Sequence, residues 1–108
     1  MPEREGQVFA ALADSTRRKL LSTLAEGTPK TATQLAEGFP ITRQGILKHL
    51  DILEDAGLVH VQPKGREKRY SLSPEPLHSV SSWIAAIGAK WDERLQRLKD
   101  LVESDEEI

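Results

Sequence analysis

The sequence predicts a mainly α-helical fold with one small β-hairpin. Three observations predict it: capped helical patterns recur along the chain, strand-like alternation begins only after Gly57, and the C-terminal part forms one long amphipathic pattern. A chain of 108 residues with 38% hydrophobic and 30% charged residues is typical of one globular domain. We therefore expect a single small core.

The segment before residue 30 predicts two helices. Asp14 can cap the second helix, which would cover residues 15–26 until Gly27 ends it. The first helix would cover about residues 5–13. An apolar stripe on the first helix consists of Val8, Phe9 and Leu12. On the second helix we expect core positions at Leu20, Leu21 and Leu24.

Three cations, Arg17, Arg18 and Lys19, fall in the first turn of the second helix. The helix dipole disfavours positive charge there unless an anion offsets it. A DNA phosphate or an acidic neighbour such as Asp14 could provide that anion. For Arg17 we favour a structural ion pair over a DNA contact.

A short helix is predicted after Thr31. Thr31 and Gln34 have the spacing of a capping box, in which each side chain accepts a backbone hydrogen bond from the other residue. We expect Gly38 to end the helix in a left-handed conformation, and Pro40 prevents its continuation. The chain must therefore turn at once.

A second helix should begin after Thr42, a good N-cap, and end at Gly57. Its inward positions are Ile46, Leu50 and Leu53, and its outward cations and amides, Arg43, Gln44 and Lys48, precede the acids Asp51, Glu54 and Asp55. Only the N-terminal half of this helix therefore suits a polyanion. An ordinary solvated helix explains the same pattern equally well.

Gly45 lies inside this second helix, where glycine costs about 1 kcal/mol relative to alanine. Close approach of another backbone would compensate for that cost. Either the preceding helix or DNA could make this approach.

A basic hairpin follows. Residues 58–61 predict a strand, residues 62–67 a turn and residues 68–72 the returning strand. Four cations and one acid give the segment from residue 64 to residue 69 a net charge of +3, although the whole chain carries −2. The charge could simply protect a strand edge, but directly behind a helix-turn-helix it favours phosphate contact. This order of elements is that of a winged helix-turn-helix.

The last predicted helix, about residues 76–102, is too long for a small domain to cover alone. Its apolar stripe recurs every three or four residues, at Leu77, Val80, Ile84, Ile87, Trp91, Leu95, Leu98 and Val102. We expect a second copy to cover the outer part, with Trp91 as an anchor. The alternative is packing within one chain. The expected dimer contacts are Val8, Phe9, Leu12, Ile84, Ile87, Trp91, Leu95 and Leu98, and residues 103–108 would form a frayed acidic tail outside a domain of residues 1–102.

Two separated segments of the chain resemble the ArsR/SmtB-type winged helix-turn-helix transcriptional regulators. FAALADSTRR at residues 9–18 is similar to that family's LADPTRR segment, and KHLDILEDAGLV at residues 48–59 is similar to its HLxxLxxAGLV signature. The resemblance covers nearly the whole chain. It implies that the helix after Thr42 is the recognition helix, that residues 64–69 form the wing, and that the terminal helices make a dimer contact.

The chain departs from many relatives at the positions where they sense metal. Those relatives use a cysteine pair near the start of the short helix, where this chain has Thr31 and Thr33 and where neutral hydroxyls are poor ligands for soft ions. The chain contains no cysteine, and His49, His60 and His78 lie on different predicted elements. We therefore expect a branch that senses no metal, with no metal site and no cofactor.

Two residues of the recognition helix differ in their expected roles. Leu47 replaces the small hydroxyl residue that relatives commonly have, and it could contact a thymine methyl or pack under the wing; we favour packing. His49 lies at the edge of the apolar face, so we expect a half-buried supporting residue.

These observations predict a DNA-binding transcriptional regulator. A homodimer would bind an inverted repeat, with recognition helices about 34 to 36 Å apart or a multiple of this, and repress by excluding polymerase. The alternative is a winged-helix module that binds protein.

An enzyme is not expected, because no nucleophile–base pair or phosphate loop is present. Without a long apolar run, a signal peptide or cysteine, we expect no membrane partner and a cytoplasmic protein. The expected DNA-binding residues are Thr42, Arg43, Gln44, Gly45, Lys48, Lys64, Arg66, Lys68 and Arg69.

Overall fold

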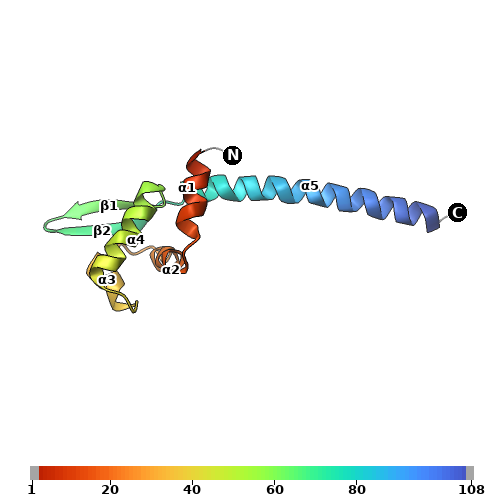
Figure 1. Cartoon of the computed structure of the whole chain (residues 1–108). Helices are drawn as coiled ribbons and strands as arrows, with labels where there is room; N and C mark the ends of the chain where they lie inside the picture. The colour runs from red at the N-terminus through yellow and green to blue at the C-terminus, as the bar shows by residue number, and fades with distance from the viewer. Residues whose placement is uncertain (1–2, 107–108) are drawn as a thin grey trace. The chain divides into compact units, whose positions relative to one another are not determined.

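The computed structural model describes residues 3–106, and it confirms a mainly α-helical fold with a β-hairpin (Figure 1). The chain divides into two units, one ending at His78 and one beginning at Ser79. The elements, in order, are α1 (Glu3–Leu12), α2 (Ser15–Leu24), α3 (Ala32–Glu37), α4 (Arg43–Asp55), β1 (Val59–Lys64), β2 (Glu67–Leu72) and α5 (Glu75–Glu106).

Side-chain caps start three of the helices as the sequence predicts. Asp14 accepts hydrogen bonds from the backbone N–H groups of Thr16 and Arg17, at 2.8 and 3.1 Å. Thr31 forms the expected capping box with Gln34. Thr42 accepts the N–H of Gly45 at 3.1 Å. These bonds satisfy N–H groups that have no partner within the helix, and each is worth about 1 kcal/mol.

Several helix ends differ from the prediction. α1 begins two residues earlier than expected, and α2 ends at Leu24 because Ala25 already forms its C-cap, two residues before the positive-φ Gly27. The expected left-handed conformation of Gly38 is wrong, since its φ is −93°. Tight backbone bonds, from Gly38 N to Leu35 O and from Phe39 N to Ala36 O, close this short helix instead.

The hairpin turn is shorter than the predicted turn over residues 62–67. The strands pair in register from Val59–Leu72 to Lys64–Glu67, so only Gly65 and Arg66 form the loop. Gly65 has a φ of +64°, as the first central residue of a type II′ turn requires. A two-residue turn of this type matches the twist of the strands, and therefore β1 extends through Pro63, which pairs with Lys68.

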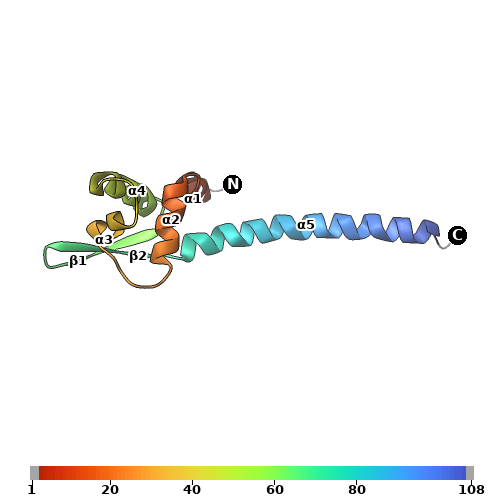
Figure 2. The ribbon, with the colours of Figure 1, turned by 90° about the horizontal axis from the view of Figure 1, so that it is seen from below.

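A single bridge joins the linker before α3 to the hairpin. Lys30 N donates to Tyr70 O at 3.1 Å, and Tyr70 N donates to Lys30 O at 2.8 Å. The bridge therefore fixes the start of the helix-turn-helix against β2. Beyond it, the tip of the hairpin extends past α3 and α4 in both views (Figures 1 and 2).

The core of the first unit holds α4 by its inward face. Ile46, Leu50 and Leu53 have no exposed surface, as their spacing predicts. They pack with other buried residues from α2, α3 and the hairpin, among them Leu20, Leu21, Leu24, Leu35, Leu58 and Val59. Complete burial of each large aliphatic side chain contributes about 1.5–3 kcal/mol, which fixes the orientation of α4.

In the second unit, α5 continues through Glu106, so the prediction of a frayed end from Glu103 is wrong up to that residue. Bonds between residues four apart support this last part: Gln96 donates to Asp100 at 2.9 Å, and Lys99 pairs with Glu103 at 3.9 Å. Glu107 and Ile108, the rest of the expected tail, lie outside the described residues. None of the described helices combines the length and apolar character that a membrane span needs.

Candidate nucleic-acid interface

The exposed surface of α4 begins with polar and cationic side chains. Thr42, Arg43, Gln44 and Lys48 are exposed and Gly45 is half-buried, whereas the exposed acids Asp51, Glu54 and Asp55 occupy the second half. The positive potential is therefore confined to the N-terminal half, where recognition helices meet base edges.

The preceding helix does not pack closely against Gly45, so it does not compensate for the free-energy cost of glycine inside α4. The nearest atoms to a Cβ built at Gly45 belong to the side chains of Thr42 and Ile41, at 3.5 Å or more. Because these are ordinary contacts, no backbone of the first unit approaches closely here. Of the two expected approaches, only that of DNA stays as a prediction.

A hollow lies between α3, the first half of α4 and the tip of the hairpin. Arg43 and Leu47 line it from α4, and Arg66 and Lys68 line it from the hairpin. Two acids, Asp51 and Glu67, share the same walls. The other lining residues are Thr31, Ala32, Thr33, Gln34 and Tyr70. The fold thus brings cations from the recognition helix and the hairpin to one concave surface.

The predicted wing cations do not all face this hollow. Lys68 is two residues from the buried Tyr70 on β2 and shares its side of the hairpin. Lys64 and Arg69 lie on the opposite side, and Arg69 pairs with Glu67 at 3.5 Å. The contribution of Arg69 to the positive potential is therefore partly cancelled.

Tyr70 anchors the base of the hairpin from inside the hollow. Its exposed fraction is 4%. Burial raises the pKa of the Tyr70 phenol above its ordinary value of 10.0, and the negative charges of Asp51 and Glu54 raise it further, while Arg43 lowers it. The phenol is therefore neutral at physiological pH.

Leu47 lies on the wall of the hollow and is half-buried. The core of the first unit does not include it, although its neighbour Ile46 is fully buried. Both contacts expected for Leu47, with the wing and with a thymine methyl, are open to a side chain in this position.

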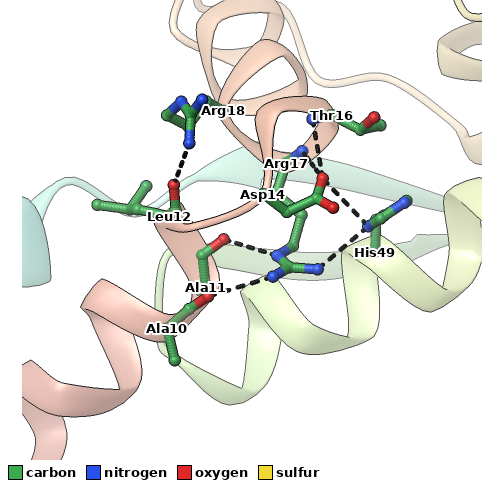
Figure 3. A network of polar contacts seen from close by, with 8 residues as sticks. All are labelled: Ala10, Ala11, Leu12, Asp14, Thr16, Arg17, Arg18 and His49. Carbon is green, nitrogen blue, oxygen red and sulfur yellow. Dashed lines mark hydrogen bonds and ion pairs between the residues drawn. The ribbon is translucent and has the colours of Figure 1, made fainter.

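The Arg17 guanidinium makes hydrogen bonds to other residues of the protein (Figure 3). Its Nε donates to Ala11 O at 2.6 Å and its Nη2 to Ala10 O at 3.2 Å, both at the end of α1. The neighbouring Arg18 donates to Leu12 O at 2.7 Å. The negative end of the α1 dipole therefore offsets the two cations. The structural role expected for Arg17 is confirmed, but backbone carbonyls replace the expected ion pair as its nearest partners.

The same guanidinium reaches α4. Arg17 Nη1 lies 3.4 Å from His49 Nδ1, and that nitrogen lies 4.0 Å from Asp14 Oδ1. The His49 side chain is 23% exposed, which confirms the expected half-burial, whereas its supporting role stays a prediction. The contact between Arg17 and His49 was not predicted, because 32 residues separate them in the sequence.

Asp14 lies at the centre of this group as the cap of α2. The hydrogen bond from the Arg17 backbone N–H is the largest cause that lowers the pKa of the Asp14 carboxyl below its ordinary 3.8. Desolvation, the second-largest cause, raises this pKa, and the Thr16 N–H and the nearby His49 and Arg17 side chains lower it further. Asp14 is therefore held as a carboxylate.

The other histidine side chains on described elements are not drawn into this group. His60 Nδ1 lies 3.1 Å from Ser73 Oγ, at the base of the hairpin. Among the described residues, no three histidine, cysteine, aspartate or glutamate side chains gather as a metal site would require.

The predicted dimer residues fall in different environments. Val8 is 1% exposed and belongs to the core of the first unit, whereas Phe9 and Leu12 on α1 are half-buried. The α5 residues are all exposed: Ile84 by 54%, Ile87 by 39%, Trp91 by 58%, Leu95 by 58% and Leu98 by 59%. Arg94 lies over the Trp91 ring, 5.8 Å from its centroid.

Known proteins share both the sequence and this arrangement. Residues 12–62 match the model of a helix-turn-helix domain family. The chain is 42% identical over 84 residues to the uncharacterized HTH-type transcriptional regulator YuzN of Bacillus subtilis, covering 71% of this chain and 91% of that protein. It is 38% identical over 88 residues to the transcriptional repressor SdpR of the same species, covering 82% and 97%.

A solved structure agrees with the fold. The ArsR-like transcriptional regulator from Rhodococcus sp. RHA1 superposes with a TM-score of 0.78 and 39% identity, over 91% of this chain and 92% of that one. The chain belongs to the ArsR family of winged helix-turn-helix transcriptional regulators. As in other ArsR-family proteins, α3 and α4 form the helix-turn-helix and the β1–β2 hairpin is the wing.

Proposed function

We propose that this ArsR-family protein is a homodimeric repressor that binds an inverted-repeat operator. The observation that carries the proposal is the hollow in which Arg43 from α4 meets Arg66 and Lys68 from the wing. A concave cationic surface beside the exposed start of a recognition helix suits the edge of a major groove and its phosphates. SdpR, one of the similar proteins, is itself named a repressor.

Each part of the proposed interface has a separate role. Arg43 and Gln44 lie in the first turn of α4, where side chains can reach base edges, and Thr42 and Gly45 allow the backbone to approach. The cations Lys48, Lys64, Arg66, Lys68 and Arg69 would contact phosphates, which position a protein but carry no sequence information. The acids after residue 50 would hold the end of α4 away from the duplex.

The proposed dimer would use the apolar stripe of α5. Several large apolar side chains there, including Trp91 and Leu95, are more than half exposed. A second copy of the same helix would cover them by symmetry, and Phe9 and Leu12 of α1 would add to the contact. Two recognition helices would then meet major grooves about 34 to 36 Å apart, or at a multiple of that distance. Because a regulator must reach DNA, we also expect the protein to act in the cytoplasm.

The test is selection of bound duplexes from a random DNA pool by the purified protein at low salt. We expect enrichment of an inverted repeat that two protomers bind together. Enrichment of no sequence, or equal weak binding to every duplex, would contradict an operator-binding repressor. Binding to no duplex at all would favour a winged-helix module for protein partners instead.

A further inference from the structure

Arg17 contacts two elements that the proposed repressor must hold in a fixed relation. On one side its guanidinium donates to the carbonyls of Ala10 and Ala11, at the end of α1. On the other side it donates to Nδ1 of His49 on α4, at 3.4 Å (Figure 3). The two carbonyls lie between Phe9 and Leu12, which are expected at the dimer contact. Arg17 thus links the end of a dimer helix to the middle of the recognition helix.

The chemistry of the link requires arginine. A guanidinium offers five N–H donors in a rigid plane, so it can bond two carbonyls and a ring nitrogen together. A lysine ammonium could keep the charge but not this planar geometry. Because arginine cannot accept, the bond also requires the His49 tautomer in which Nδ1 carries no proton.

We propose that Arg17 is a positioning residue that fixes the angle of α4 relative to α1 and thereby sets the half-site spacing that the dimer accepts. The inference rests on the proposed function, because spacing has meaning only for a dimer on two half-sites. Arg17 touches no DNA in this proposal. It acts through His49, whose Nδ1 accepts from the Arg17 guanidinium.

Arg18 provides a matched control. Its guanidinium donates to Leu12 O at 2.7 Å, again at the end of α1, and among the described residues it makes no hydrogen bond to α4. Arg18→Ala therefore removes the same charge from the same turn of α2 and also removes a bond to α1, while the link to α4 stays. An effect of charge alone should be equal in the Arg17 and Arg18 variants, and an effect of lost bonds to α1 should appear in both.

The experiment compares the selected operator with versions in which one base pair is inserted or removed between the half-sites. One base pair moves a half-site by about 3.4 Å and rotates it by about a tenth of a turn. We expect wild type to lose at least about tenfold in affinity on the altered operators, and Arg18→Ala to do the same. Arg17→Ala should bind the correct operator about tenfold less tightly, since bonds from charged groups are among the stronger ones. Its loss on the altered operators should be clearly smaller than that of wild type.

Variants at His49 isolate the contact with α4. His49→Ala removes the acceptor but leaves the bonds of Arg17 to α1, and should relax spacing as Arg17→Ala does. His49→Asn places an amide oxygen near the position of Nδ1 and should restore the wild-type preference. Circular dichroism melting of each variant shows whether it is folded at the assay temperature. If Arg17→Ala is not folded, Arg17→Lys and the His49 pair give the same comparison.

Three results would overturn the inference. The spacing preference of folded Arg17 and His49 variants could equal that of wild type. The salt dependence of binding could fall in Arg17→Ala by about the 0.9 that one lost phosphate contact removes, which would make Arg17 a DNA contact. Arg18→Ala could relax spacing as much as Arg17→Ala. Wild type that binds no duplex would instead overturn the proposed function, and this inference with it.

Discussion

The role of each cation in this protein depends on the groups that its side chain faces. Arg17 and Arg18 donate to backbone carbonyls at the end of α1, so their charge is partly offset within the fold. Lys48 and Arg66 are exposed and have no acid within ion-pair distance among the described residues. At the residue scale, the second pair is therefore the one that phosphates can recruit.

Lys48→Ala and Arg66→Ala should each weaken DNA binding and flatten its salt dependence. Each phosphate contact contributes about −0.9 to the slope of log K against log salt, because it releases condensed counterions. The measurement is fluorescence anisotropy of a labelled operator over a series of salt concentrations. Lys99→Ala is the control, since Lys99 on α5 is exposed and pairs with Glu103. A slope that stays unchanged in both test variants would contradict phosphate contact.

Asp14 should make stability depend on pH in the acidic range. The pKa of its carboxyl is lowered in the folded protein, so its contribution is fully present above the ordinary value of 3.8 and is lost as the pH falls through the folded value. Asp14→Asn keeps a good N-cap but removes the charge. The free energy of urea unfolding should favour wild type at about pH 7, and the difference should shrink below about pH 4. A difference that is constant over this range would refute the assignment.

Among the elements, the hairpin is the one whose shape depends on a single backbone conformation. Gly65 takes a φ of +64° in the two-residue loop, and nothing lies within 4 Å of the Cβ that another residue would add. The constraint is therefore one of backbone strain and not of space. Because this two-residue loop connects Lys64 to Glu67, the backbone conformation of Gly65 sets the position of the wing tip.

Gly65→Ala should lower the free energy of unfolding by about 1–2 kcal/mol, the cost of a left-handed conformation for a residue with a Cβ. Gly6→Ala is the matched control. Gly6 lies within α1 without a positive φ, and its Cβ would also meet nothing within 4 Å, so alanine there should stabilise by up to about 1 kcal/mol. Denaturant unfolding followed by circular dichroism measures both. Equal effects of the two changes would show that the turn is not strained.

Structural features could be predicted from the sequence where they depend on interactions between residues close together in the chain. The caps at Asp14, Thr31 and Thr42 act over two or three residues, and all three were predicted. The end of α3 at Gly38 and the length of the turn were not, because hairpin register and tight i→i−3 bonds decide them after the strands pair. At the candidate interface, the cations could be named from their charge. Their division between the two sides of the hairpin needed the register.

At the scale of the whole molecule, α5 carries surface that one chain leaves in water. Exposed fractions along its stripe and beside it reach 65%, at Leu101, and the helix is 32 residues long. Clusters of large exposed apolar side chains in one row usually mark an interaction site. A second α5 offers the same row and therefore suits it.

Trp91→Ala should convert the proposed dimer into monomers at micromolar concentration and lose operator affinity together with it. Removal of a central aromatic anchor costs about 2 kcal/mol or more at an interface. Sedimentation velocity reports the mass, and anisotropy reports DNA binding. Asp92→Ala, the exposed neighbour off the stripe, should change neither. Wild type that sediments as a monomer would contradict the dimer.

Pro63 limits the ability of the exposed edge of β1 to pair with a strand of another molecule. Hydrogen-bonded and non-hydrogen-bonded pairs alternate along an antiparallel ladder, and the pair that closes a two-residue turn, Lys64–Glu67, is of the bonded kind. The next pair, Pro63–Lys68, therefore leaves the proline nitrogen pointing to the free border of β1. This edge of β1 therefore has one N–H donor fewer for pairing with a strand of another molecule. The charge of the neighbouring Lys64 also repels the Lys64 of a second copy. Both features disfavour edge-to-edge pairing of β1 with another copy, although the hairpin extends from the domain.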